Sequence, residues 1–89
     1  MKATEGFRLR KLGQEFIVVG EGLAQVNFNK MISLNSSAAY LWESIQGKEF
    51  TVNDLAQLLV DKYGIDMDLA LKDSASIADA WANAGIAQK

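Results

Sequence analysis

The amino-acid sequence predicts an α+β fold in which a three-stranded antiparallel sheet is followed by a cluster of three helices, in the order β-β-β-α-α-α. Strand-like alternation fills the first third of the chain, helical apolar spacing fills the rest, and glycines and capping side chains separate the segments. The chain has 89 residues, 49% of them apolar, which fits one folded domain spanning residues 1–89.

A β-hairpin opens the predicted sheet. Residues 7–12 alternate apolar with basic side chains, and residues 15–19 form a β-branched and aromatic run. Gly13-Gln14 separates the two runs and predicts the turn between them. Arg8 and Arg10 share the outward face of the first strand. Together with Lys11 they form a basic cluster that either keeps the surface soluble or meets an acidic partner.

The third predicted strand leads directly into the first helix. Its apolar residues share one parity and therefore face one side of the sheet: Val26, Phe28, Ile32 and Leu34. A break or bulge is expected near Asn29-Lys30. Residues 31–34 contain neither proline nor charge, the features that normally protect an edge strand from pairing. Either something covers this edge or something binds it.

Capping residues and glycines delimit the first two helices. Asn35 and the serines after it offer side chains to the free N–H groups of a first helix over residues 36–46, and Gly47 supplies a left-handed stop. Thr51, with Asp54 three residues later, approximates a capping box for the second helix.

The third helix begins after Tyr63-Gly64 ends the second. The carboxylate of Asp66 is expected to cap its first turn, and Gly85 is expected to end it. Its predicted apolar stripe is Leu69, Ile77, Trp81 and Ala84. Trp42 and Trp81 are expected to be the largest side chains of a core where the sheet covers one side of the helices, in a winged-helix-like arrangement.

Composition excludes several functions. The chain has no cysteine and no histidine, which removes thiolate and imidazole ligands, the commonest general base and the usual nucleophile pairs. Neither an enzyme nor a bound metal or cofactor is therefore expected. The sequence shows no signal peptide and no membrane span, so a cytoplasmic protein is expected. A net charge of −2 argues against nucleic acid as a partner.

An ordered set of short motifs runs through the last two thirds of the chain. Its members are Leu34-Asn35, the small residues Ser36-Ser37-Ala38-Ala39, Leu41-Trp42, Gly47, Thr51-Val52, Asp54-Leu55, Tyr63, Asp73, Ile77 and Gly85-Ile86. In order and spacing this set resembles the coenzyme PQQ synthesis protein D (PqqD-like) family over roughly residues 30–87.

The resemblance implies a non-enzymatic adaptor for a ribosomally made precursor peptide, in the PQQ pathway or another. Such a domain captures the leader segment of the peptide and presents it to a modifying enzyme, a radical SAM enzyme being one candidate. In that family the peptide adds as a strand beside the third strand and lies against the third helix, which is β-augmentation. The expected peptide-binding residues are Met31, Ile32, Ser33 and Leu34 on the strand, and Lys72, Ser76 and Asp79 on the helix. The backbone of Ile32 and Leu34 is expected to bind, since their side chains face the core.

Two alternatives remain open. In a structural module, a second copy of the chain would bury the strand edge and form a homodimer. In a DNA-binding winged helix, the third helix would enter the major groove. Residues 66–84 would then bring four acidic residues and one lysine to the phosphates, which is the wrong sign of charge.

Overall fold

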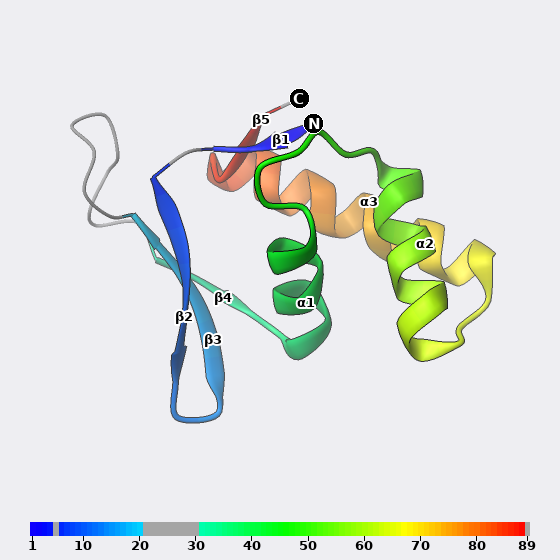
Figure 1. Cartoon of the computed structure of the whole chain (residues 1–89), viewed down its shortest axis with the longest axis horizontal. Coiled ribbons are helices and arrows are strands. Elements are labelled where there is room, and N and C mark those ends of the chain that lie inside the picture. The colour runs from blue at the N-terminus through cyan, green and yellow to red at the C-terminus, as the bar shows by residue number, and fades with distance from the viewer. Residues whose placement is uncertain (5, 21–30, 89) are drawn as a thin grey trace.

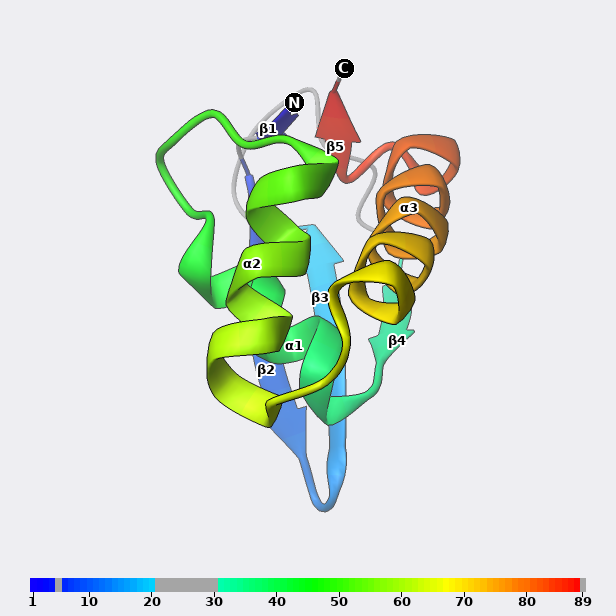
Figure 2. The ribbon, with the colours of Figure 1, turned by 90° about the vertical axis from the view of Figure 1, so that its right-hand side faces the viewer.

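The computed structural model describes residues 1–4, 6–20 and 31–88 (Figure 1). In chain order its elements are β1 (Lys2–Ala3), β2 (Phe7–Leu12), β3 (Glu15–Gly20), β4 (Met31–Leu34), α1 (Ser36–Ser44), α2 (Val52–Tyr63), α3 (Met67–Ala84) and β5 (Ala87–Gln88). Strands β2, β3 and β4 form an antiparallel sheet in that order, and the three helices lie on one side of it (Figure 2). The predicted α+β fold is confirmed.

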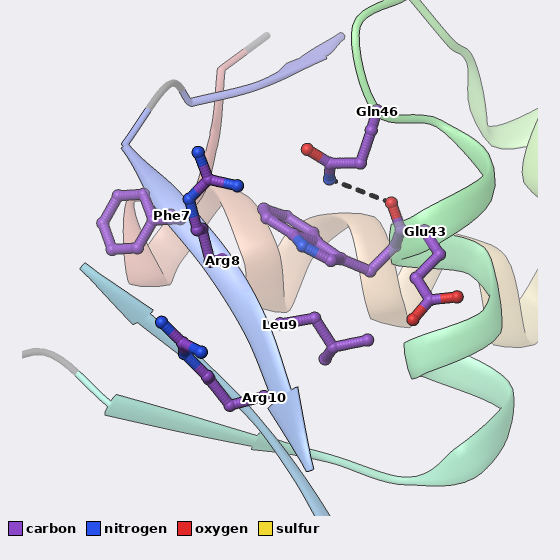
Figure 3. A pocket seen from close by; sticks show the side chains of 7 residues that line it. Phe7, Arg8, Leu9, Arg10, Glu43 and Gln46 are labelled. Atoms are coloured by element: carbon purple, nitrogen blue, oxygen red, sulfur yellow. Dashed lines mark hydrogen bonds between the residues drawn. The ribbon is translucent and has the colours of Figure 1, made fainter. Parts of the chain in front are cut away.

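The predicted hairpin is also confirmed. Leu12 of β2 pairs with Glu15 of β3, so the loop consists of Gly13 and Gln14 alone. Gly13 has a φ of 62°, and no non-glycine residue in the described ranges has a positive φ. This combination matches a type II′ turn, whose first central position favours glycine. On β2, the side chain of Leu9 points toward α1 (Figure 3).

Strand β4 completes the sheet. Its four residues pair with β3 from Met31, opposite Val19, to Leu34, opposite Phe16. The third predicted strand is therefore confirmed over residues 31–34. The rest of that prediction, residues 26–30 with their bulge, lies outside the described residues.

Helix α1 begins as predicted but ends earlier. The backbone N–H of Ala38 donates to Oδ1 of Asn35 at 2.8 Å, so Asn35 is the N-cap. The helix ends at Ser44, not at residue 46. In place of a continuing helical N–H, the side-chain amide of Gln46 donates to the carbonyl of Trp42 at 2.9 Å. This competing bond gives the chain an alternative to another helical turn.

The starts of α2 and α3 differ. Thr51 and Asp54 form the predicted capping box: the Asp54 N–H donates to Thr51 Oγ1 at 3.1 Å, and the Thr51 N–H donates to Asp54 Oδ2 at 2.9 Å. Asp66 occupies the N-cap position of α3, but its carboxylate accepts no capping hydrogen bond, so that prediction is wrong. Its charge still lies at the positive end of the helix dipole. Gly85 ends α3 as predicted, with a φ of 79°. No helix in the described ranges is both long and apolar enough to cross a membrane.

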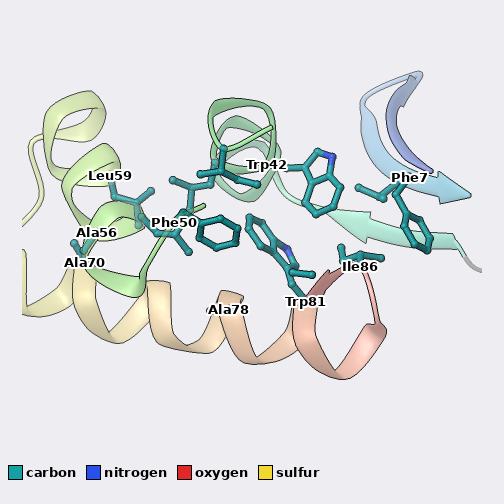
Figure 4. Close-up of a cluster of buried hydrophobic side chains, with 14 residues drawn as sticks. Phe7, Trp42, Phe50, Ala56, Leu59, Ala70, Ala78, Trp81 and Ile86 are labelled. Carbon is teal, nitrogen blue, oxygen red and sulfur yellow. The ribbon is translucent and has the colours of Figure 1, made fainter. Parts of the chain in front are cut away.

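Two tryptophans form the centre of the core, as predicted. Trp42 and Trp81 are 1% and 2% exposed, and their rings meet edge to face with centroids 5.3 Å apart (Figure 4). Phe50 packs edge to face on Trp81 at 6.0 Å. Because Trp42 lies on α1 and Trp81 on α3, this cluster joins the first helix to the last.

The buried face of α3 differs from the predicted stripe. Its fully buried residues are Ala70, Ser74, Ala78 and Trp81. Leu69 is 49% exposed, so its assignment to the core was wrong. Each residue turns an α-helix by about 100°, which carries Leu69 away from the face that holds Ala70. Small side chains on the buried face allow α3 to lie close to α2.

A second, two-stranded sheet was not predicted. Strand β1 pairs with β5, with Lys2 opposite Gln88. The backbone N–H of Phe50 donates to the carbonyl of Met1 at 2.7 Å, and the Met1 amino group donates to the carbonyl of Phe50 at 2.8 Å. These bonds tie the first residues to the loop before α2. Strands of two residues are too short to show any periodicity in the sequence.

Candidate functional site

Strand β4 forms one open edge of the sheet. It follows β3 in the strand order and has no further strand beside it among the described residues. Leu12 and Glu15 flank a two-residue loop, so they are a hydrogen-bonded pair, and hydrogen-bonded pairs alternate along antiparallel strands. Following this alternation across β3, Ile32 and Leu34 bond to β3, whereas the backbone groups of Met31 and Ser33 point to the open edge.

This register changes the expected roles within β4. The sequence prediction assigned peptide bonding to the backbone of Ile32 and Leu34, but their N–H and C=O groups point to β3. The side chains of both residues are half-buried and pack against the core, in agreement with the predicted parity. Ser33 is exposed, and its backbone is available at the edge. The open edge is therefore a short template of main-chain donors and acceptors, next to a side chain that a partner can reach.

A pocket of about 520 Å³ lies where β4 passes into α1. We call it the α1 N-terminal pocket, and its lining residues are Asn35, Ser36, Ser37, Leu59, Tyr63, Ile65, Asp73 and Ile77. Among the described residues, the walls combine aliphatic side chains with polar ones and with the Tyr63 ring, and Asp73 supplies the one carboxylate. An extended segment on the β4 edge would meet this pocket at its end, because Asn35 directly follows β4.

The predicted residues of α3 lie beside this pocket but do not line it. Lys72, Ser76 and Asp79 are all exposed. Asp73 and Ile77 line the pocket instead, one helical turn apart. Both belong to the motif set that carries the family resemblance, so the sequence held a signal for them. We expected the exposed face of α3 to contact the peptide, but the pocket lies against the neighbouring face of the helix. Composition alone does not show which of these two faces borders a pocket.

An aromatic and cationic cluster borders the pocket. Tyr63, which lines the pocket, meets Tyr40 edge to face with ring centroids 6.4 Å apart. The Lys62 ammonium lies 4.8 Å from the centre of the Tyr40 ring and 5.9 Å from that of Tyr63. These contacts fix the end of α2 against α1. Tyr63 remains 44% exposed, so its ring is accessible to a partner.

The acidic residues of α3 are spread along the helix. Among the described residues, no three carboxylates gather closely enough to hold a metal ion. Asp68, Asp73 and Asp79 are exposed along α3, with Lys72 as its one basic residue. This distribution repels phosphates.

Residues 12–87 match the family described as Coenzyme PQQ synthesis protein D (PqqD). The chain belongs to the PqqD family. The match begins earlier than the motif set, since it includes β3 and the end of β2.

One solved structure similar to this PqqD-family protein is TbiB1 in complex with the TbiA(beta) leader peptide. The TM-score is 0.71 and the sequence identity is 16%, and the alignment covers 97% of this chain and 93% of that one. At this identity the likeness shows a shared fold. No curated protein matches the chain in sequence.

Proposed function

We propose that this PqqD-family protein, acting as one domain over residues 1–89, captures the leader segment of a ribosomally made precursor peptide on the β4 edge. The observation that carries the proposal is the open edge of β4, where the backbone groups of Met31 and Ser33 have no partner strand among the described residues. Membership of the PqqD family supports it. A similar fold, that of TbiB1, is known in complex with a leader peptide, which adds further support.

In this proposal the peptide binds as a fourth strand. Its backbone bonds to Met31 and Ser33 and supplies affinity that does not depend on sequence. Side chains then supply specificity. An apolar residue of the peptide enters the α1 N-terminal pocket between Ile65 and Ile77. Lys72, Ser76 and Asp79, on the exposed face of α3, are proposed contacts for the outer side of the peptide.

The protein would act as a carrier and not as a catalyst. Binding by strand addition requires no nucleophile, general base or cofactor. The captured peptide is presented to a modifying enzyme, with a radical SAM enzyme as one candidate class. The cytoplasm, where a precursor peptide is made, is the proposed location.

A proline scan of β4 tests this proposal. The peptides to use are those encoded by short reading frames beside this gene, synthesised with a fluorescent label. Ser33→Pro removes an N–H that points to the open edge and leaves the bonds between β3 and β4 in place. We expect it to weaken binding at least about tenfold, the loss of roughly one main-chain hydrogen bond. Fluorescence anisotropy measures the affinity.

Ser33→Ala is the matched control, because it removes the same hydroxyl and keeps the N–H. It should bind within about twofold of the wild type. Circular dichroism establishes that both variants are folded. Equal affinity of a folded Ser33→Pro variant and the Ser33→Ala variant would exclude strand addition on β4.

A homodimer through β4 is the second candidate, and the lack of charge on this edge favours it, because two copies could pair there without repulsion. Light scattering over a range of protein concentrations distinguishes such a homodimer from a monomer that binds a peptide. A dimer that Ser33→Pro converts to a monomer, and that peptide does not dissociate, would favour the structural role.

A further inference from the structure

The opposite end of the sheet holds a second open edge. Strand β2 pairs with β3 on one side and has no strand on its other side among the described residues. The hydrogen-bonded pairs place the backbone groups of Arg8, Arg10 and Leu12 toward β3. Those of Phe7, Leu9 and Lys11 therefore point outward, and no described residue forms a backbone hydrogen bond with them. This β2 edge is longer than the β4 edge.

A pocket of about 510 Å³ lies against the β2 edge, between the strand and α1 (Figure 3). Its lining residues are Phe7, Arg8, Leu9, Arg10, Trp42, Glu43 and Gln46. Side chains of a strand added here would alternate between two surroundings. One set would face the helix side, with Leu9, Glu43 and Gln46. The other set would face the side of Arg8 and Arg10.

The charge of the β2 edge opposes that of the whole chain. Arg8 and Arg10 are two residues apart on one face of the strand, and both are exposed. Lys11 adds a third positive charge, whose ammonium lies 5.7 Å from the centre of the Phe16 ring. Within the part of the chain that the structure describes, Glu43 is the single acidic residue of the pocket lining. The edge thus concentrates three positive charges on a protein with a net charge of −2.

We propose that the β2 edge binds an extended acidic segment of a partner protein by strand addition. Acidic residues of that segment, at every second position, would lie opposite Arg8 and Arg10, and the alternate apolar residues would enter the pocket beside Leu9. The main chain of Phe7, Leu9 and Lys11 would supply the ladder of hydrogen bonds.

Charge also argues against a second copy of this chain as the occupant. In a two-fold antiparallel pairing centred on residue 8, 9 or 10, an arginine of one copy always lies opposite an arginine of the other. Like charges directly opposite each other destabilise such a pair. An acidic segment turns the same side chains into favourable contacts.

The test uses a synthetic nine-residue peptide in which glutamate and valine alternate, with blocked ends, added to the ¹⁵N-labelled full chain. The expected result is a concentration-dependent shift of the amide signals of Phe7, Leu9 and Lys11 in the NMR spectrum. The shift should weaken strongly in 0.5 M salt, because salt screens exposed charges. The same peptide with lysine in place of glutamate should cause no shift.

Two charge variants locate the contact. Arg8→Glu should raise the dissociation constant of the acidic peptide at least tenfold. Lys72→Glu makes the same change of charge on α3, at the β4 end of the sheet (Figure 2), and should change it less than twofold. Both side chains are exposed, so both variants should remain folded.

Two variants of Lys11 test whether the main chain of β2 binds the peptide. Lys11→Pro and Lys11→Ala both remove the lysine and its contact with Phe16, but only proline removes the outward N–H. Lys11→Pro should bind the peptide at least fivefold more weakly than Lys11→Ala.

Three results would overturn the proposal. The first is no shift on β2 at millimolar peptide, which would mean that the basic residues only block the edge. The second is shifts confined to Ser33 and its neighbours, which would place acidic segments on β4. The third is a dimer formed through β2. None of these results affects capture of a leader peptide by β4, which the Ser33 variants measure separately.

Discussion

The two open edges of the three-stranded sheet present the same backbone chemistry with different side chains. The β4 edge has four residues, none of them charged, and lies at the α3 end of the sheet (Figure 2). The β2 edge has six residues, three of them basic, and borders α1. Charge is a common means of protecting an edge strand from indiscriminate pairing. The uncharged edge is thus open to many sequences, whereas the charged edge selects for acidic ones.

If both proposals hold, this difference lets a small domain distinguish two extended partners. Main-chain bonds alone cannot separate them, because every peptide offers the same donors and acceptors. The side chains beside each edge determine which peptide binds there. Since the two edges lie at opposite ends of one sheet, occupation of one leaves the other accessible, which suits the proposed role of a carrier that holds a peptide and presents it to an enzyme.

The largest expected effect tests whether one core supports both edges. Trp42 belongs to α1, which borders the β2 edge, and packs on Trp81 of α3, at the β4 end. Trp42→Ala should lower the free energy of unfolding by about 3–5 kcal/mol, because it leaves a large cavity. That is a large share of the roughly 5–13 kcal/mol expected for a domain of this size. Urea denaturation measures the loss.

Trp42→Phe is the control, since it retains a ring against Trp81. It should lose about 1–2 kcal/mol. If Trp42→Ala left the urea midpoint unchanged, the two flanking helices would be stabilised independently, and the comparison would have to treat the edges as separate units.

Most of the fold could be predicted from the sequence because local signals agreed. Alternation on β2, the capping box at Thr51 and the terminal Gly85 each fix an element through neighbouring residues. The errors arose at elements whose structure depends on contacts between residues that are distant in the sequence. Strand β1 forms through its pairing with β5 and through the bonds between the preceding Met1 and Phe50, and the buried face of α3 depends on how closely α2 approaches.

The candidate site was less predictable than the fold. Sequence parity assigned Ile32 and Leu34 to the core, in agreement with their partial burial. It could not show which backbone groups face outward, because that depends on the register across two strand pairs. The α1 N-terminal pocket joins residues of α1, α2 and α3, and no spacing in the chain relates Leu59 to Asp73.

A smaller effect concerns the hairpin that holds the β2 edge in place. Gly13 has a φ of 62°, and space around it is open, so Gly13→Ala adds only backbone strain. We expect a loss of about 1–2 kcal/mol. Gln14→Ala, in the same turn at a residue without positive φ, should change stability by less than about 0.5 kcal/mol.

Hydrogen exchange sharpens this test. The amides of Arg8 and Arg10 bond to β3, and that of Ile32 bonds to β3 from the other side. In Gly13→Ala, exchange of the two arginine amides should accelerate more than exchange of the Ile32 amide. Equal acceleration of all three would mean that the sheet opens as one unit, and that the β2 edge has no local stability of its own.

The smallest expected effect lies inside α3, the helix at the β4 end. Ser74 is fully buried, and its hydroxyl has no hydrogen-bond partner among the described residues. Ser74→Ala removes this unpaired group and favours the helix, so the free energy of unfolding should rise by about 1 kcal/mol. Ser76→Ala, on the exposed face, gains helix propensity alone and should add about 0.5 kcal/mol. Thermal unfolding compares the two variants.

A loss of stability in Ser74→Ala would show that the hydroxyl has a partner in solution, such as a bound water between α2 and α3. The position of α3 beside β4 would then depend on that polar contact and not on close packing of small side chains.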